Sequence, residues 1–118
     1  MEIFVKFDFA ASRRLTKLPD AHPCSRVHGH TFQVKITLVG EVDPSTGFMV
    51  DFSFVEEKLD DVKAVVDHRY LNDINGLENP TTEILAQWLW QYLSRDLSTL
   101  TTISVQEHYS RGVTYRGD

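Results

Sequence analysis

The sequence contains one cysteine, no apolar run near the roughly 18 residues of a membrane span, and no excess of positive charge. A single cysteine excludes a framework of disulfides within the chain and is typical of a reducing compartment. The net charge of −5 leaves no basic footprint for nucleic acid or for a membrane surface. No signal-peptide core is visible. We therefore expect a cytoplasmic protein that binds neither nucleic acid nor membranes.

What the sequence does contain is the composition of an ordinary globular chain. It has 118 residues, of which 42% are hydrophobic and 25% charged. A chain of this length can bury a core without disulfides or metals to hold it together. No internal repeat, linker or low-complexity segment interrupts it, and we expect one domain over residues 1–118.

Alternating apolar residues predict two long strands. The first begins at residues 2–8 and runs on toward Arg13, and the second covers residues 31–38. Residues 16–27 between them contain two prolines and indicate an irregular loop. His28 and His30 have the same parity as Phe32 and Val34, so they continue the apolar row of the second strand. Their side chains are expected on the covered face of a sheet.

The rest of the chain predicts two helices and further strands. A short strand over 48–52 precedes a helix that starts at a capping box of Ser53 and Glu56. The helical spacing of Val55, Leu59, Val62 and Val66 predicts its buried side. A second helix follows Pro80, with Asn79 or Thr81 as its cap. Strands over 102–106 and 113–115 complete the order. This order of elements indicates an α+β fold in which both helices lie on one face of an antiparallel sheet. The other face of the sheet is then left for a second subunit.

Two groups of side chains suggest chemistry. Cys24, His28 and His30 offer two imidazoles with the spacing of metal ligands and a thiol that a nearby cation would activate. Histidines satisfied by backbone partners are the structural alternative. Glu107 shares the parity of the apolar residues Ile103 and Val105, where a carboxylate is costly without partners. A binding role and a structural salt bridge are both open for it.

The ordered motifs of the chain resemble the 6-pyruvoyltetrahydropterin synthase family over essentially its whole length. The matching segments are Phe9-Ala10-Ala11 with Arg14-Leu15, Cys24-x3-His28-Gly29-His30, Gly40 to Pro44 with Thr46-Gly47, Asp51-Phe52, Asp67-His68 with Tyr70 to Asp73, Gly76 to Thr81 with Glu83, Glu107, and the ending Tyr115 to Asp118. The three residues between the cysteine and the first histidine favour the 6-carboxytetrahydropterin synthase branch, which serves queuosine biosynthesis. The pyruvoyl-forming enzymes carry a longer insert there.

This resemblance implies a fold, a substrate and an assembly. The tunnelling fold has a four-stranded antiparallel sheet with two helices on one face, and its subunits close into a barrel as trimers or hexamers with active sites between subunits. The substrate would be 7,8-dihydroneopterin triphosphate, and a zinc-dependent lyase would release 6-carboxytetrahydropterin, acetaldehyde and triphosphate. A phosphate-eliminating 6-pyruvoyl synthase and a metal-free, non-catalytic pterin-binding homologue are the alternatives.

The resemblance also implies roles for residues. His28 and His30 match zinc ligands, and zinc would act as a Lewis acid on substrate oxygens. Cys24 matches the catalytic base, and Asp67 with His68 matches a second acid–base pair. The pterin-binding residues matched are Glu107, Thr81 and Thr82.

Position 13 departs from the family pattern. A histidine that serves as the first zinc ligand is replaced by Arg13, whose guanidinium stays protonated and has no lone pair for a metal. His22 is the favoured substitute as third ligand, while water or Cys24 is another. His108 is disfavoured because its parity is opposite to that of Glu107. Alternatively the metal is lost, and Arg13 becomes an electrophile or a clamp for the triphosphate.

Overall fold

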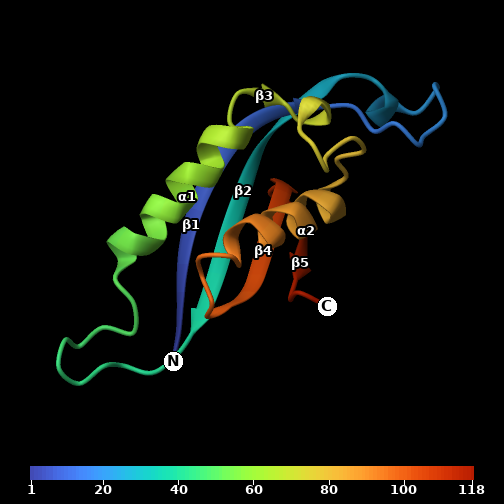
Figure 1. Cartoon of the computed structure of the whole chain (residues 1–118). Coiled ribbons are helices and arrows are strands. Elements are labelled where there is room, and N and C mark those ends of the chain that lie inside the picture. Colours follow the sequence, from blue (N-terminus) through green and yellow to red (C-terminus); the bar gives the residue numbers. More distant parts are fainter.

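A computed structural model describes residues 1–118 and contains a five-stranded sheet with two helices (Figure 1). The sheet order is β3-β1-β2-β4-β5. Strands β1 (Glu2–Arg13), β2 (His28–Val39), β4 (Leu100–His108) and β5 (Arg111–Tyr115) are antiparallel, and the two-residue β3 (Arg69–Tyr70) runs parallel to β1 at the edge. The helices are α1 (Phe52–Val66) and α2 (Thr82–Leu93), with short 3-10 turns η1 (Pro23–Ser25) and η2 (Leu71–Asp73).

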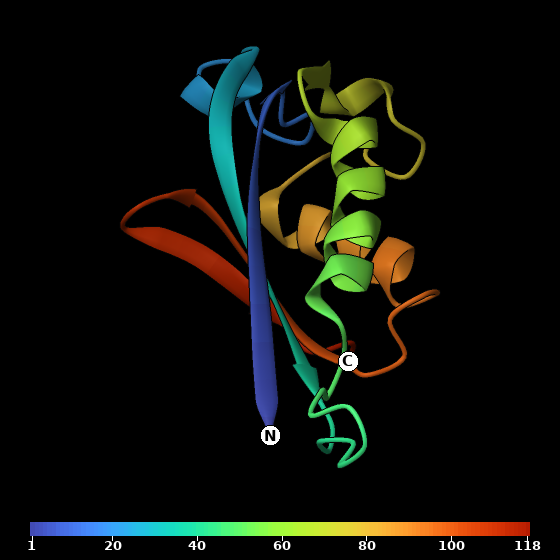
Figure 2. The same ribbon diagram turned by 90° about the vertical axis from the view of Figure 1, so that its left-hand side faces the viewer.

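Both helices cover the same face of the sheet (Figure 2). Between the two layers lies a core of 20 buried apolar residues, which includes the predicted stripe of α1: Val55, Leu59, Val62 and Val66. The alternating apolar residues of the strands fill this layer, because successive side chains of a strand point to opposite faces of the sheet. The predicted α+β class, with four antiparallel strands under two helices, is confirmed.

The pairing of β1 with β2 places the sequence motifs at one end of the sheet. Its register runs from Glu2 opposite Val39 to Arg13 opposite His28, with Ala11 opposite His30. Directly paired residues of antiparallel strands project to the same face. The side chains of Arg13, His28 and His30 therefore lie on the helix-covered face, as parity predicted for the two histidines.

Two local predictions were wrong. Residues 48–51 form no strand, and the capping box of Ser53 does not start α1. Asp51 caps the helix instead, since its carboxylate accepts a hydrogen bond from the Ser53 backbone N–H at 2.8 Å. A carboxylate that caps free amide groups lets the helix begin at Phe52, while residues 48–51 before it form bends and irregular backbone.

The sheet also has an edge strand that the sequence did not predict. His68 follows α1 with a φ of 57°, and its N–H donates to the Ala10 carbonyl at 2.6 Å. This reversal sets Arg69 and Tyr70 beside Ala11 and Ser12 as β3.

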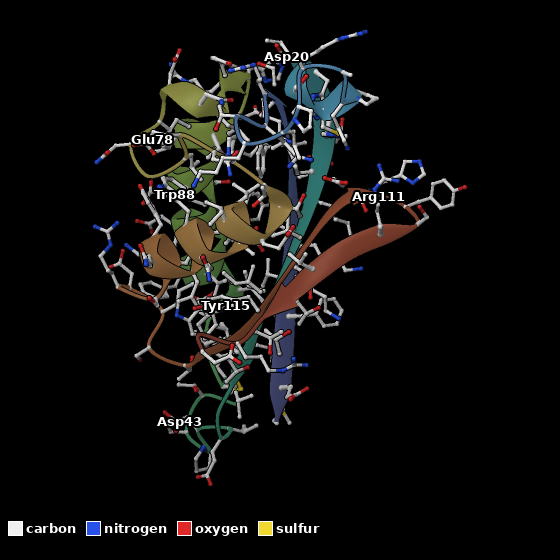
Figure 3. The ribbon with its side chains drawn as sticks, turned by 90° about the vertical axis from the view of Figure 1, so that its right-hand side faces the viewer. Asp20, Asp43, Glu78, Trp88, Arg111 and Tyr115 are labelled. Atoms are coloured by element: carbon white, nitrogen blue, oxygen red, sulfur yellow. The ribbon has the colours of Figure 1, made fainter.

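The face opposite the helices has no cover within the chain. Phe4 and Val39 on it are 55% and 38% exposed, and the ammonium groups of Lys6 and Lys35 lie 5.6 and 4.6 Å from the Phe4 ring centre. The molecule is elongated, 59 × 23 × 23 Å, with Asp20 and Asp43 at its two ends (Figure 3). Neither helix has the length and apolar character needed to cross a membrane.

Candidate functional site

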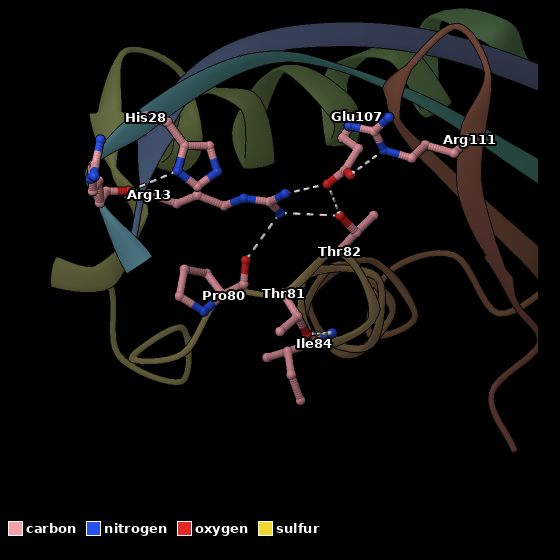
Figure 4. Close-up of polar contacts among 9 residues, drawn as sticks. Arg13, His28, Pro80, Thr81, Thr82, Ile84, Glu107 and Arg111 are labelled. Carbon is pink, nitrogen blue, oxygen red and sulfur yellow. Dashed lines mark hydrogen bonds and ion pairs between the residues drawn. The ribbon is translucent and has the colours of Figure 1, made fainter. Parts of the chain in front are cut away.

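A buried arginine anchors the motif-bearing end of the sheet. Arg13 ends β1, is 2% exposed, and extends toward the start of α2 (Figure 4). Its Nη1 donates to the Pro80 carbonyl at 3.2 Å and to Thr82 Oγ1 at 3.1 Å, while Nη2 forms an ion pair with Glu107 Oε2. The guanidinium is thus fixed to two segments that are distant in the sequence, the start of α2 and β4.

These contacts offset the cost of placing the Glu107 carboxylate on the apolar row of β4. Its Oε2 also accepts from the Thr82 hydroxyl at 2.6 Å, and Oε1 accepts from Arg111 Nε at 2.8 Å. Burial alone would raise the pKa of Glu107, but the hydrogen bonds from Thr82, Arg111 and Arg13 outweigh it and lower the pKa to about 2. The carboxylate is therefore ionised, and both its oxygens are engaged by the chain's own groups.

The hydroxyls at the start of α2 have different roles. Thr81 caps the helix, because its Oγ1 accepts from the Ile84 N–H at 3.1 Å. This confirms one of the two predicted caps. Thr82 is buried and links Arg13 to Glu107.

His28 and His30 stack edge to face on the same side of the sheet, with ring centres 5.0 Å apart. His28 Nδ1 lies 2.8 Å from the Arg26 carbonyl oxygen, so Nδ1 carries the proton and Nε2 is left with a lone pair. That Nε2 is buried and has no partner in the chain. Burial lowers the pKa of His30, and the charge of Arg13 lowers it further.

The residues do not form the three-histidine zinc site that we expected. His22 is exposed at the N-terminus of η1, where its Nδ1 accepts from the Cys24 N–H at 3.1 Å. His108 is exposed and contacts Ser110 Oγ at 2.8 Å. No group of three His, Cys, Asp or Glu side chains that could hold a metal ion comes together anywhere in the chain. His22 is thus not joined to His28 and His30, because its ring serves as the cap of η1.

Four predicted residues and Arg13 line one small cleft. Cys24, which is partly buried, lies there with Arg13, Thr81, Thr82 and Glu107. The cleft has a volume of about 270 Å³, close to the lower limit of roughly 300 Å³ for small-molecule sites. A larger hollow of about 930 Å³ lies on the uncovered sheet face, and no predicted site residue lines it. The chemistry is therefore concentrated in the smaller cleft.

Asp67 and His68 lie elsewhere, at the β1 edge. Asp67 Oδ1 accepts from the Ala10 N–H at 2.9 Å, and Oδ2 lies 3.0 Å from His68 Nδ1. The Ala10 hydrogen bond is the chief cause of the lowered pKa of Asp67. The His68 side chain is 82% exposed and lines a separate, shallow hollow. Within one chain, this pair does not share the cleft of Cys24.

Arg111 is a site residue that the sequence reasoning missed. It binds Glu107 across the β4–β5 turn and lines the cleft with Cys24. A cation four residues after an unpaired carboxylate, across a predicted hairpin, is the signal that would have identified it.

Comparison with known proteins gives consistent results. The family described as 6-pyruvoyl tetrahydropterin synthase matches residues 2–118. A 6-carboxy-5,6,7,8-tetrahydropterin synthase of Synechocystis is 36% identical over 77% of this chain and 73% of its own length. One of Bacillus subtilis is 41% identical over 68% of this chain and 57% of its own length.

The fold comparison agrees with the sequence matches. The structure of Caenorhabditis elegans 6-pyruvoyl tetrahydropterin synthase covers 100% of this chain and 96% of its own, with a TM-score of 0.92 at 28% identity. The resemblance stated from the motifs and the tunnelling fold are confirmed. The relatives carry the names of enzymes, which also confirms the prediction that the chain is an enzyme, a lyase.

Proposed function

Because the chain belongs to the 6-pyruvoyl tetrahydropterin synthase family, we propose that it converts 7,8-dihydroneopterin triphosphate and water to 6-carboxytetrahydropterin, acetaldehyde and triphosphate. The observation that carries this proposal is the cleft in which Cys24 lies with Thr81, Thr82 and Glu107. Two relatives named 6-carboxytetrahydropterin synthase and the three-residue spacing before His28 favour this branch.

Cys24 is the base that removes a proton from the side-chain carbon next to the pterin ring. The guanidinium groups of Arg13 and Arg111 line the same cleft. A cysteine sulfur accepts a proton as the thiolate, and the sulfur of Cys24 would do so in this cleft.

Asp67 and His68 return a proton on the other side of the substrate. The Asp67 carboxylate 3.0 Å from His68 Nδ1 keeps the proton on that nitrogen and leaves Nε2 to exchange one. His68 projects into solvent within one chain. A trimer or hexamer in which His68 of one subunit faces the Cys24 cleft of another would complete the site, and it would also cover the free sheet face.

Glu107 accepts hydrogen bonds from the amino and ring N–H groups of the pterin. Its Oε1 is now bound by Arg111, whose side chain is 60% exposed, whereas Arg13 on Oε2 is almost fully buried. Arg111 is therefore the partner that moves aside when the pterin enters, and Oε2 stays fixed. Thr81 and Thr82 line the cleft beside it.

The resemblance implies zinc, but this chain offers only the imidazoles of His28 and His30, with the guanidinium of Arg13 in place of the third ligand. A protonated guanidinium repels a dication and supplies no lone pair. These residues do not fit the metal, and the steps above use only the chain's own groups.

Turnover of 7,8-dihydroneopterin triphosphate, with acetaldehyde and triphosphate measured separately, tests this function. Acetaldehyde in equal amount to triphosphate supports the proposal. Triphosphate without acetaldehyde indicates the 6-pyruvoyl synthase, and pterin binding without turnover indicates a non-catalytic homologue. The cytoplasmic location and the place in queuosine biosynthesis remain predictions.

A further inference from the structure

We infer that the guanidinium of Arg13 stands where a bound metal ion would lie, so that this chain is a metal-free member of its family. His28 and His30 then act as hydrogen-bonding groups and not as metal ligands. The inference concerns the chain's own residues and can be tested without turnover.

The register of β1 and β2 places Arg13 beside the two histidines. Arg13 is paired directly with His28 on the neighbouring strand, and directly paired side chains lie within about 5.5 Å of one another at Cβ. The Arg13 Cζ atom lies 5.2 Å from the centre of the Phe32 ring, and His30 lies 5.5 Å from the same ring. The positive charge thus stands beside both imidazoles.

The contacts of Arg13 keep the charge there. Its two terminal nitrogens are held by Pro80, Thr82 and Glu107, and the residue is 2% exposed. A metal ion that displaced the guanidinium would leave the Glu107 carboxylate without its buried partner. A metal ion that did not displace it would lie against a fixed positive charge.

Two unpartnered atoms show what this place can accept. Arg13 Nε and His28 Nε2 are the only buried side-chain nitrogen or oxygen atoms in the chain without a hydrogen-bond partner. The first is a donor, and the second has a lone pair. A hydroxyl group can accept from a donor such as Arg13 Nε and donate to a lone pair such as that of His28 Nε2, whereas a metal ion can use only the lone pair. If the proposed function holds, a side-chain hydroxyl of the pterin is that group.

Metal binding provides the decisive test. We expect the wild-type chain, purified and then given Zn²⁺ or Co²⁺, to hold less than about 0.1 metal per chain after desalting and to lack the visible absorption of tetrahedral cobalt. Arg13→His supplies the third imidazole and should bind one ion per chain. Its gain in affinity should exceed the roughly hundredfold effect of outer-shell partners.

Two variants control this measurement. Arg13→Gln removes the charge without adding a strong ligand and should stay metal-free, and Arg13→His with His28→Ala should lose the ion again. One zinc per wild-type chain, lost in His28→Ala, would overturn the inference. This result stands even if Arg13→His fails to fold.

Pterin binding tests the hydroxyl. Neopterin, which carries side-chain hydroxyls, should bind about tenfold more tightly than 6-methylpterin, and His28→Phe should remove the difference. Equal affinities in the wild type would overturn the hydroxyl assignment alone. Failure to bind either pterin would overturn it together with the proposed function, while the metal result would be unaffected.

Discussion

The Arg13–Glu107 cluster and the Asp67–His68 pair show two ways of holding catalytic-type side chains. In the first, every contact is internal: Arg13 is 2% exposed, and Glu107 accepts from three side chains. In the second, Asp67 contacts one ring nitrogen of His68, but the His68 side chain is 82% exposed. One subunit therefore organises a binding cleft completely, whereas the acid–base pair is oriented and left open for a neighbour.

Replacing the thiol in the closed cleft should have the largest effect. We expect Cys24→Ala to lower kcat by about 10³-fold or more, since general-base catalysis contributes up to about 10⁴-fold. Cys24 is only partly buried, so circular dichroism and pterin affinity should stay unchanged. Turnover within threefold of wild type would remove Cys24 from the mechanism.

A change in the Asp67–His68 pair should lower kcat by a smaller factor. Asp67→Asn can still accept from the Ala10 N–H but no longer stabilises a charged His68 ring, so kcat should fall about 10²-fold with little change in KM. Steady-state kinetics measure this. Asp73→Asn, an exposed aspartate outside the pair, is the matched control, and an equal loss in both variants would contradict the assignment.

A change in the Arg13–Glu107 cluster should instead lower the free energy of unfolding. Glu107→Gln leaves the buried Arg13 charge without its ionic partner, and we expect the free energy of unfolding to fall by about 2 kcal/mol. Urea unfolding measures it. The exposed Glu78→Gln should stay within about 0.5 kcal/mol of wild type. A Glu107→Gln variant as stable as the control would show that the ion pair adds nothing.

Acid should weaken the same cluster. Because the pKa of Glu107 is lowered from 4.5 to about 2 in the folded chain, its contribution is complete above about pH 4.5 and is lost as the pH falls toward 2. Urea unfolding at a series of pH values should show this decline, and Glu107→Gln should show a shallower one. Identical slopes in the two proteins would refute the lowered pKa.

The smallest effect is expected for the free energy of unfolding when His68 is replaced. His68 has a φ of 57°, a conformation that glycine adopts without strain, so His68→Gly should change the free energy of unfolding by less than about 0.5 kcal/mol. Turnover should nevertheless fall. Arg69→Gly, in the extended β3, should cost about 1 kcal/mol. A larger loss in His68→Gly than in Arg69→Gly would mean that the ring stabilises the fold.

Prediction from sequence succeeded where the pattern is local. The parity of residues 28–38 placed His28 and His30 on the covered face, and the spacing of four apolar residues predicted the buried side of α1. It failed where two local signals competed. Ser53 and Glu56 offered one cap, and Asp51 offered another. The cap at Asp51 starts the helix two residues earlier, and the predicted short strand does not form.

The sequence by itself determined the faces of the two long strands, the α+β class and the absence of a third histidine at position 13. These follow from period-two geometry and from the chemistry of single residues. Only the tertiary structure decided what Arg13 binds, since Glu107 is 94 positions away and comes near through the order of β1, β2 and β4. It also decided that His22 caps η1 and that Asp67 and His68 lie outside the Cys24 cleft. Such contacts depend on how strands are ordered and loops close, which no local pattern encodes.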